Sequence, residues 1–275
     1  MGRFLGSPSQ VVLVLGAAAA LLLALPAVLA RAAPAVGQPA AASDMAAPVV
    51  PVNEPAVRPA AAPAPAPARP RSEPPGFLVV APGPSGEIVV RSRPRGRVVA
   101  RLGSRTEFGS PTTLGVVRKR GRWLGVVTTH LPNGRLGWVD RRESPLRYSR
   151  TRVSLVLDLS ARRLVLKRGD RAVRKMTVGV GRPSSPTPVG RFAVTDNLSG
   201  PAYSPYYGCC ILALSAHQPN LPPDWTGGDR IAIHGTNDSS SIGLASSAGC
   251  PRASDADLRV LMRRVPLGTH VFVRS

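Results

Sequence analysis

The sequence predicts a mostly β protein, in which a small β-barrel precedes a curved β-sandwich with one packed helix. Three observations carry this prediction. Short apolar runs separated by turn signals begin near residue 77. Runs of the same kind restart at Thr151 and continue almost to residue 275. A single segment, residues 254–265, instead has the apolar spacing of an amphipathic helix.

The first 30 residues predict an export segment. The run from Val11 to Ala30 carries no charge, follows a short segment containing Arg3, and ends in small residues. It is longer than the usual secretory core of about 7 to 15 residues and approaches the roughly 20 residues that span a bilayer. Pro26 near its end favours cleavage. A cleaved signal peptide and an uncleaved membrane anchor both remain open.

Residues 31–75 predict a disordered spacer. This stretch, exemplified by "PAAAPAPAPARPRSEPP", is almost entirely Ala, Pro, Val, Glu and Arg. Such a composition lacks the mixed apolar volume that would offset the entropy of an ordered chain. We therefore expect an extended Ala/Pro-rich linker between the export segment and the folded modules.

The formal net charge of +21 predicts attraction to polyanions. Nucleic acid is disfavoured as a partner, because the Arg residues are scattered and aromatic residues make up only 4% of the chain. For an exported protein, the relevant anions are cell-wall polymers and lipid head groups. A solvated basic surface without a specific partner explains the charge equally well.

Residues 76–148 predict the barrel, with about five short strands. The spacing of "GRWLGV" and "GRLGWV" makes this stretch resemble a bacterial Src-homology-3-like domain. Asn133 followed by Gly134 indicates a hairpin turn. Trp123 and Trp138 are predicted to pack in the core, with a ligand groove as the minority interpretation.

Residues 151–275 predict the second module. Alternating apolar residues from Val153 begin a series of hairpin-linked strands, and a loop with three prolines, "GRPSSPTPVGRFAVT", interrupts it. The helix should start after Ser254, which is followed three residues later by Asp257 in a capping pattern. Further strands are expected at residues 191–195, 210–215, 230–234 and 270–273.

The stretch "HGTNDSSSIGLASSAGCPR" contains a candidate base and a candidate nucleophile, His234 and Cys250. A thiol attacks as its thiolate, so it needs a base or a positive field to lower its pKa from near 8.5. His234 supplies the base, and Arg252 and the following helix N-terminus supply positive charge. We therefore expect a nucleophilic cysteine at this turn.

Pro251 constrains any oxyanion hole near this cysteine. Proline has no N–H, so the donors would have to be the backbone N–H groups of Cys250 and of Gly249 or Ala248. No metal is expected, because no third or fourth ligand accompanies His234 and Cys250.

The other cysteines and histidines are interpreted as structural. Cys209 and Cys210 are adjacent, and neighbouring residues on a strand point to opposite faces, so we expect two separate thiols rather than a disulfide. His217 is expected to make structural hydrogen bonds. Tyrosines and a tryptophan between the strands are candidates for a substrate lid, namely Tyr203, Tyr206, Tyr207 and Trp225.

The stretch "IAIHGTNDSSSIGLASSAGCPR" closely resembles the signature of the L,D-transpeptidases, the YkuD-like domains. The loop Pro-Thr-Pro-x-Gly and the closing "PLGTHVFV" extend the resemblance over roughly residues 153–273. It implies a cofactor-free acyl transfer on peptidoglycan stem peptides. Cys250 would be the nucleophile and His234 the general base, with the Gly235 carbonyl orienting the imidazole. Ser247 matches the serine of the signature, and Arg252 matches a substrate-holding residue.

Two positions depart from the family pattern. Ala248 stands where many members have histidine, and Pro251 replaces a branched apolar residue. We expect an exported L,D-transpeptidase that works in the cell wall or periplasmic space, whose barrel positions wall substrate. An L,D-carboxypeptidase, in which water resolves the thioester, and a non-catalytic wall-binding protein remain alternatives.

Overall fold

The computed structural model describes residues 76–83, 86–223, 225 and 227–275. The expected export segment at residues 1–30 and the expected spacer at residues 31–75 lie outside these ranges. Within the described part, none of the helices is long and apolar enough to cross a membrane.

The first folded region is a sheet of seven strands in the order β3-β2-β6-β5-β4-β1-β7, with antiparallel pairs throughout. Its core is a cluster of buried aliphatic side chains that includes Ile88, Leu124 and Val139. The strands are β1 (Phe77–Pro82), β2 (Ile88–Arg91), β3 (Val98–Leu102), β4 (Leu114–Arg120), β5 (Trp123–Val126), β6 (Gly137–Asp140) and β7 (Leu146–Thr151).

This sheet has two more strands than the roughly five expected, because β1 and β7 pair with each other along their whole length. Strand β7 reads Leu-Arg-Tyr-Ser-Arg-Thr and is mostly exposed, so it lacks the apolar alternation that marks a strand. Trp123 and Trp138 are buried, as predicted for core residues. The relation to Src-homology-3-like domains stays a prediction.

The second region is a seven-stranded sheet in the order β10-β9-β8-β16-β12-β13-β14. All its pairs are antiparallel except that of β8 with β16, which is parallel. The predicted strand at residues 230–234 is confirmed without change. The strands are β8 (Val153–Asp158), β9 (Arg163–Arg168), β10 (Arg171–Thr177), β12 (Gly190–Ser199), β13 (Cys210–His217), β14 (Arg230–His234) and β16 (His270–Arg274).

Short elements complete this region beside the large sheet. β11 (Val180–Gly181) pairs in parallel with β15 (Ala245–Ser247), and two 3-10 turns, η1 (Pro205–Tyr207) and η2 (Ser239–Ser241), interrupt the connections. β15 lies just before Cys250 in the sequence and therefore helps to place the candidate nucleophile.

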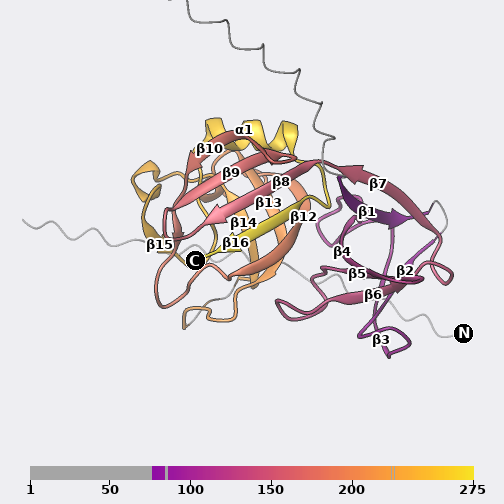
Figure 1. Ribbon diagram of the computed structural model, residues 1–275. Coiled ribbons are helices and arrows are strands. Elements are labelled where there is room, and N and C mark those ends of the chain that lie inside the picture. Colours follow the sequence, from indigo (N-terminus) through magenta and orange to yellow (C-terminus); the bar gives the residue numbers. More distant parts are fainter. Residues whose placement is uncertain (1–75, 84–85, 224, 226) are drawn as a thin grey trace, which may run out of the picture. The chain divides into compact units, whose positions relative to one another are not determined.

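The predicted helix is confirmed as α1 (Asp255–Arg264), which covers one face of the second sheet (Figure 1). The Ser254 side chain caps it by accepting a hydrogen bond from the Asp257 N–H at 3.2 Å. Leu258 and Leu261 are fully buried in the core of this sheet. Burial of each such leucine contributes about 1.5–3 kcal/mol, which fixes the segment that follows Cys250.

Candidate active site

His234 and Cys250 lie close together because the segment that follows Cys250 runs beside the end of β14. The His234 N–H donates to the Pro251 carbonyl at 3.1 Å, and the Ala253 N–H donates to the His234 carbonyl at 3.0 Å. Residues sixteen positions apart therefore belong to neighbouring backbone segments. Their side chains line the same cavity, which has a volume of about 330 Å³.

His234 is held as a neutral imidazole of defined tautomer. Its side chain is only 1% exposed, and burial lowers its pKa to about 4. Nδ1 lies 2.5 Å from the Gly235 carbonyl oxygen. Since a carbonyl can only accept, Nδ1 carries the proton and Nε2 is the basic nitrogen. The ring therefore has the protonation state that a general base needs.

Cys250 rests as a thiol. Burial raises its pKa, while the Ala232 N–H, 3.4 Å from Sγ, and the charge of Arg252 act in the opposite direction. Arg252 lowers the pKa of the thiol, as expected, but loss of solvation outweighs both lowering contributions. The pair at rest is a thiol and a neutral imidazole, so a proton must move when the sulfur attacks.

The backbone around Gly249 limits which N–H groups could bind an oxyanion. Gly249 has a φ of 121° and donates its N–H to the buried Ser247 Oγ at 3.1 Å. The Ala248 and Cys250 N–H groups donate to no group in the described part of the chain. The sequence suggested the N–H groups of Cys250, Gly249 and Ala248 as oxyanion donors. Of these, the N–H groups of Ala248 and Cys250 are available to bind an oxyanion.

Two side chains that were not predicted from the sequence hold this turn in place. Gln218 is buried, and its Nε2 donates to the carbonyl of Ala248 at 2.9 Å and to that of Pro186 at 3.0 Å. Thr187 Oγ1 donates to the Gly249 carbonyl at 2.7 Å. Thr187 belongs to the Pro-Thr-Pro loop, which the sequence did single out. Gln218 has no local signal that would have identified it.

Aromatic side chains surround the histidine. The Tyr207 ring meets His234 edge-on at 5.0 Å, and the Tyr206 ring lies 5.7 Å from it. Arg252 donates to the Tyr206 hydroxyl, and its guanidinium lies 5.2 Å from the centre of that ring. All four proposed lid residues line the cavity with Cys250, namely Tyr203, Tyr206, Tyr207 and Trp225.

Cys209 and Cys210 form a disulfide, so the expectation of two separate thiols is wrong. The alternation argument fails because Cys209 lies in the turn before β13 and only Cys210 belongs to the strand. Cys250 is the free cysteine among the three, all of which lie in the described ranges. The site therefore presents one thiol to a reagent or substrate.

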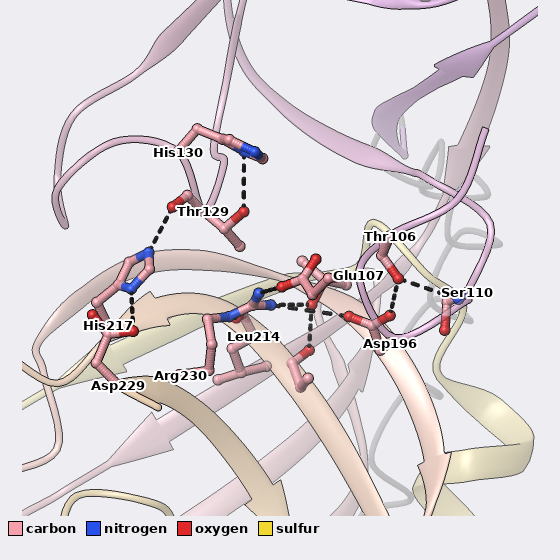
Figure 2. A network of polar contacts seen from close by, with 12 residues as sticks. Thr106, Glu107, Ser110, Thr129, His130, Asp196, Leu214, His217, Asp229 and Arg230 are labelled. Carbon is pink, nitrogen blue, oxygen red and sulfur yellow. Dashed lines mark hydrogen bonds and ion pairs between the residues drawn. The ribbon is translucent and has the colours of Figure 1, made fainter. Parts of the chain in front are cut away.

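His217 is a structural residue, as predicted, and it joins the two sheet regions (Figure 2). Its backbone N–H and carbonyl bind the Asn133 side-chain amide at 3.0 and 2.7 Å. Its Nε2 lies 2.7 Å from the Thr129 carbonyl, and its Nδ1 lies 2.9 Å from the Asp229 carboxylate. Asn133 and Gly134 lie within the β5–β6 connection rather than in a two-residue hairpin.

No group of three or more His, Cys, Asp or Glu side chains within the described residues is arranged to hold a metal ion. Fold and cavity together describe a mostly β domain in which one free thiol and one buried neutral imidazole share a pocket. This combination is typical of thiol-dependent acyl transfer.

Residues 152–273 match the sequence model of the YkuD family, described as the L,D-transpeptidase catalytic domain. The chain is 34% identical over 119 residues to a putative L,D-transpeptidase of Bacillus licheniformis, covering 43% of this chain and 64% of that protein. It is 32% identical over 117 residues to a probable L,D-transpeptidase of Escherichia coli K12, covering 38% of each. A solved L,D-transpeptidase of Mycobacterium smegmatis aligns with 19% identity and a TM-score of 0.36, over 53% of this chain and 76% of that one.

Residues 152–273 are thus similar to the L,D-transpeptidase catalytic domain of the YkuD family. The chain spans less than two thirds of the length of these two relatives. The first sheet, residues 77–151, lies outside the matched family region.

Proposed function

We propose that this protein is a cysteine-dependent L,D-transpeptidase that cross-links peptidoglycan stem peptides through a thioester acyl-enzyme. The observation that carries the proposal is the state of His234. Its Nδ1 proton is hydrogen-bonded to the Gly235 carbonyl, so Nε2 is the basic nitrogen. The imidazole ring lines the same cavity as the Cys250 thiol. The family match of residues 152–273 supplies the substrate class.

The first half-reaction forms the thioester. Cys250 Sγ attacks the carbonyl between the L-centre of a diamino acid and the terminal D-alanine, and the thiol proton passes to His234. The C–N bond then breaks, and the imidazolium gives its proton to the departing amine of D-alanine. The N–H groups of Cys250 and Ala248 are the proposed oxyanion donors.

The second half-reaction resolves the thioester. An amine from a neighbouring stem attacks the acyl carbon and passes a proton to His234, the C–S bond breaks, and the sulfur recovers that proton. The product is an amide cross-link between two diamino acids. Arg252, held by Tyr206 at the edge of the cavity, is the proposed substrate-binding cation.

The departures at Ala248 and Pro251 are compatible with this chemistry. The Ala248 carbonyl is held by Gln218, and the Pro251 carbonyl accepts the His234 N–H. Both residues are therefore part of the hydrogen-bonded frame around Cys250. This observation favours an enzyme over a wall-binding protein with a degenerate site.

We also propose that the protein works outside the cytoplasm, in the cell wall or periplasmic space. The Cys209–Cys210 disulfide supports an oxidising compartment.

Anionic wall polymers are the proposed secondary partners, because basic side chains gather around one surface depression, namely Arg150, Arg152, Lys167, Arg168 and Arg264. Sedimentation with walls before and after removal of their anionic polymers tests this partner.

Intact-mass measurement with a carbapenem tests the nucleophile. We expect one adduct on the wild type and on the Cys209→Ala/Cys210→Ala double variant, and none on Cys250→Ala. An adduct that persists on Cys250→Ala would contradict the assignment.

Mass spectrometry of reacted stem tetrapeptides then separates the activities: cross-linked dimers support a transpeptidase, and trimmed tripeptides alone indicate a carboxypeptidase. Absence of both product and adduct would leave the wall-binding alternative.

A further inference from the structure

The connection between β3 and β4 contains a tight loop, residues 105–111, that reaches the second sheet region. Arg105 and Pro111 close it through an isolated β-bridge. Inside the loop, the Thr106 N–H donates to the Ser110 carbonyl at 2.9 Å, and the Gly109 N–H donates to the Thr106 carbonyl at 3.0 Å. These hydrogen bonds within the loop define its shape independently of its contacts with the second region.

Polar contacts fasten this loop to strands β12 and β14 (Figure 2). Glu107 forms an ion pair with Arg230, the first residue of β14. Thr106 Oγ1 donates to the carboxylate of Asp196 on β12, which is fully buried. A buried carboxylate needs hydrogen-bond donors, and the Thr106 hydroxyl of the first sheet region is one of them. The loop is therefore an integral part of the structure around β14.

The loop carries Phe108 into the wall of the cavity that holds Cys250 and His234. Phe108 is only partly buried, so part of its ring is left for a ligand. Its edge-to-face partner is Tyr203, with ring centres 6.3 Å apart. The guanidinium of Arg230 lies 5.6 Å from the centre of the Phe108 ring. Glu107 and Arg230 thus fix the position of this ring.

We propose that Phe108 is a specificity-determining residue, which packs against the methylene chain of the stem peptide's diamino acid across the junction of the two regions. This inference rests on the proposed function. The cavity that Phe108 lines also has the apolar side chains of Leu198, Tyr203 and Ile211 in its wall. These surfaces favour a longer chain of methylenes over a shorter one. The first sheet region therefore completes the substrate pocket rather than only carrying the catalytic domain.

The test measures binding rather than turnover. In the full chain with Cys250→Ala, calorimetry records the dissociation constant of a stem tetrapeptide and of an analogue whose diamino acid has a shorter side chain. We expect the added Phe108→Ala substitution to weaken tetrapeptide binding about tenfold, the scale of one lost aromatic contact with its buried area. It should also bring the two peptides close to equal affinity. Phe108→Leu should restore much of the preference.

The matched control is Tyr148→Ala, which removes an exposed aromatic ring from β7 of the same sheet, away from this cavity. It should leave both dissociation constants unchanged. Thermal unfolding of each variant shows whether a loss of affinity follows from loss of fold, and Phe108→Leu provides a second, better-packed variant.

The outcomes separate this inference from the proposed function. If Phe108→Ala binds both peptides like Tyr148→Ala, the inference is wrong even when the wild type forms a carbapenem adduct and cross-links. If no tetrapeptide binds to Cys250→Ala, the inference is likewise overturned. If binding and its Phe108 dependence are found but the wild type gives no adduct or product, Phe108 determines ligand choice and the proposed reaction fails.

Discussion

Gln218 Nε2 donates to the carbonyl of Ala248 at 2.9 Å, so a side chain from the end of β13 holds the backbone two residues before Cys250. The same nitrogen donates to the Pro186 carbonyl at 3.0 Å. One buried amide therefore joins the proline-rich loop to the nucleophile turn. The Gln218 Nε2 bonds are to backbone carbonyls and not to His234 or Cys250, so we assign Gln218 a positioning role.

Replacement of Gln218 tests this positioning role. Gln218→Met keeps the length of the side chain but leaves two carbonyls without this donor, so the free energy of unfolding should fall by about 1–3 kcal/mol. The kcat of cross-linking should fall at least tenfold with a smaller change in KM. Kinetics and chemical denaturation on the same preparations measure both. A variant that loses stability but keeps its kcat would show a purely structural role.

Gly249→Ala should disable the site. Its φ of 121° is unfavourable for an L side chain, and an added Cβ would lie 2.0 Å from Gln218 Nε2. We expect loss of the carbapenem adduct and a destabilisation of about 2 kcal/mol or more. Gly103→Ala is the matched control, because no atom lies within 4 Å of its Cβ position. Normal adduct formation by Gly249→Ala would show that the turn tolerates a different conformation.

Local patterns predicted the elements whose signals lie within one segment. Ser254 and Asp257 identified the start of α1, and a strand-like run of residues identified β14 from Arg230 to His234. Strand β7 was missed, because an edge strand with mostly exposed polar residues has no apolar alternation. Strand β7 forms because it pairs along its whole length with β1, and a local sequence pattern does not reveal this long-range pairing.

The proximity of His234 and Cys250 was predictable because both residues lie in one signature. The residues that hold and complete the cavity were not, because they come from distant segments. Thr187 reaches Gly249 across 62 positions, and Phe108 lies in the first sheet region altogether. The resting protonation of Cys250 also depends on burial, which only the folded structure reveals.

Thr106→Val should weaken the junction of the two sheet regions. The substitution keeps the shape of the side chain and removes the hydroxyl that donates to Asp196, whose other oxygen has no hydrogen-bond partner within the described structure. We expect the free energy of unfolding to fall by about 1.5–3 kcal/mol, as for other hydrogen bonds to charged groups. Thr113→Val, which loses only an exposed bond to the Pro111 carbonyl, should change it by less than about 0.5 kcal/mol. Equal effects of the two substitutions in urea denaturation would contradict the proposed contribution of Asp196.

The activity should survive to unusually low pH for a histidine-dependent reaction. Burial lowers the pKa of His234 to about 4, so the ring stays neutral and basic well below the ordinary value of 6.5. The acid limb of kcat/KM, which reports the free enzyme, should therefore lie near pH 4. A pH series of cross-linking rates, with stability monitored at each pH, measures this limb. A midpoint near 6.5 would show that His234 is solvated in the working enzyme.

Stability should fall as the solution is acidified, and His270 should contribute to the slope. His270 is fully buried, and burial together with the nearby Arg191 charge lowers its pKa to about 4. Between pH 6.5 and 4, the unfolded chain binds a proton at this residue that the folded chain does not. The free energy of unfolding therefore decreases as pH falls through this window, by roughly 3 kcal/mol in total for a shift of this size. His270→Gln removes the titrating group, so its denaturation free energy should depend less steeply on pH than that of the wild type, whatever its absolute stability. Identical slopes from pH 6.5 to 4.5 would show that His270 binds its proton equally well in both states.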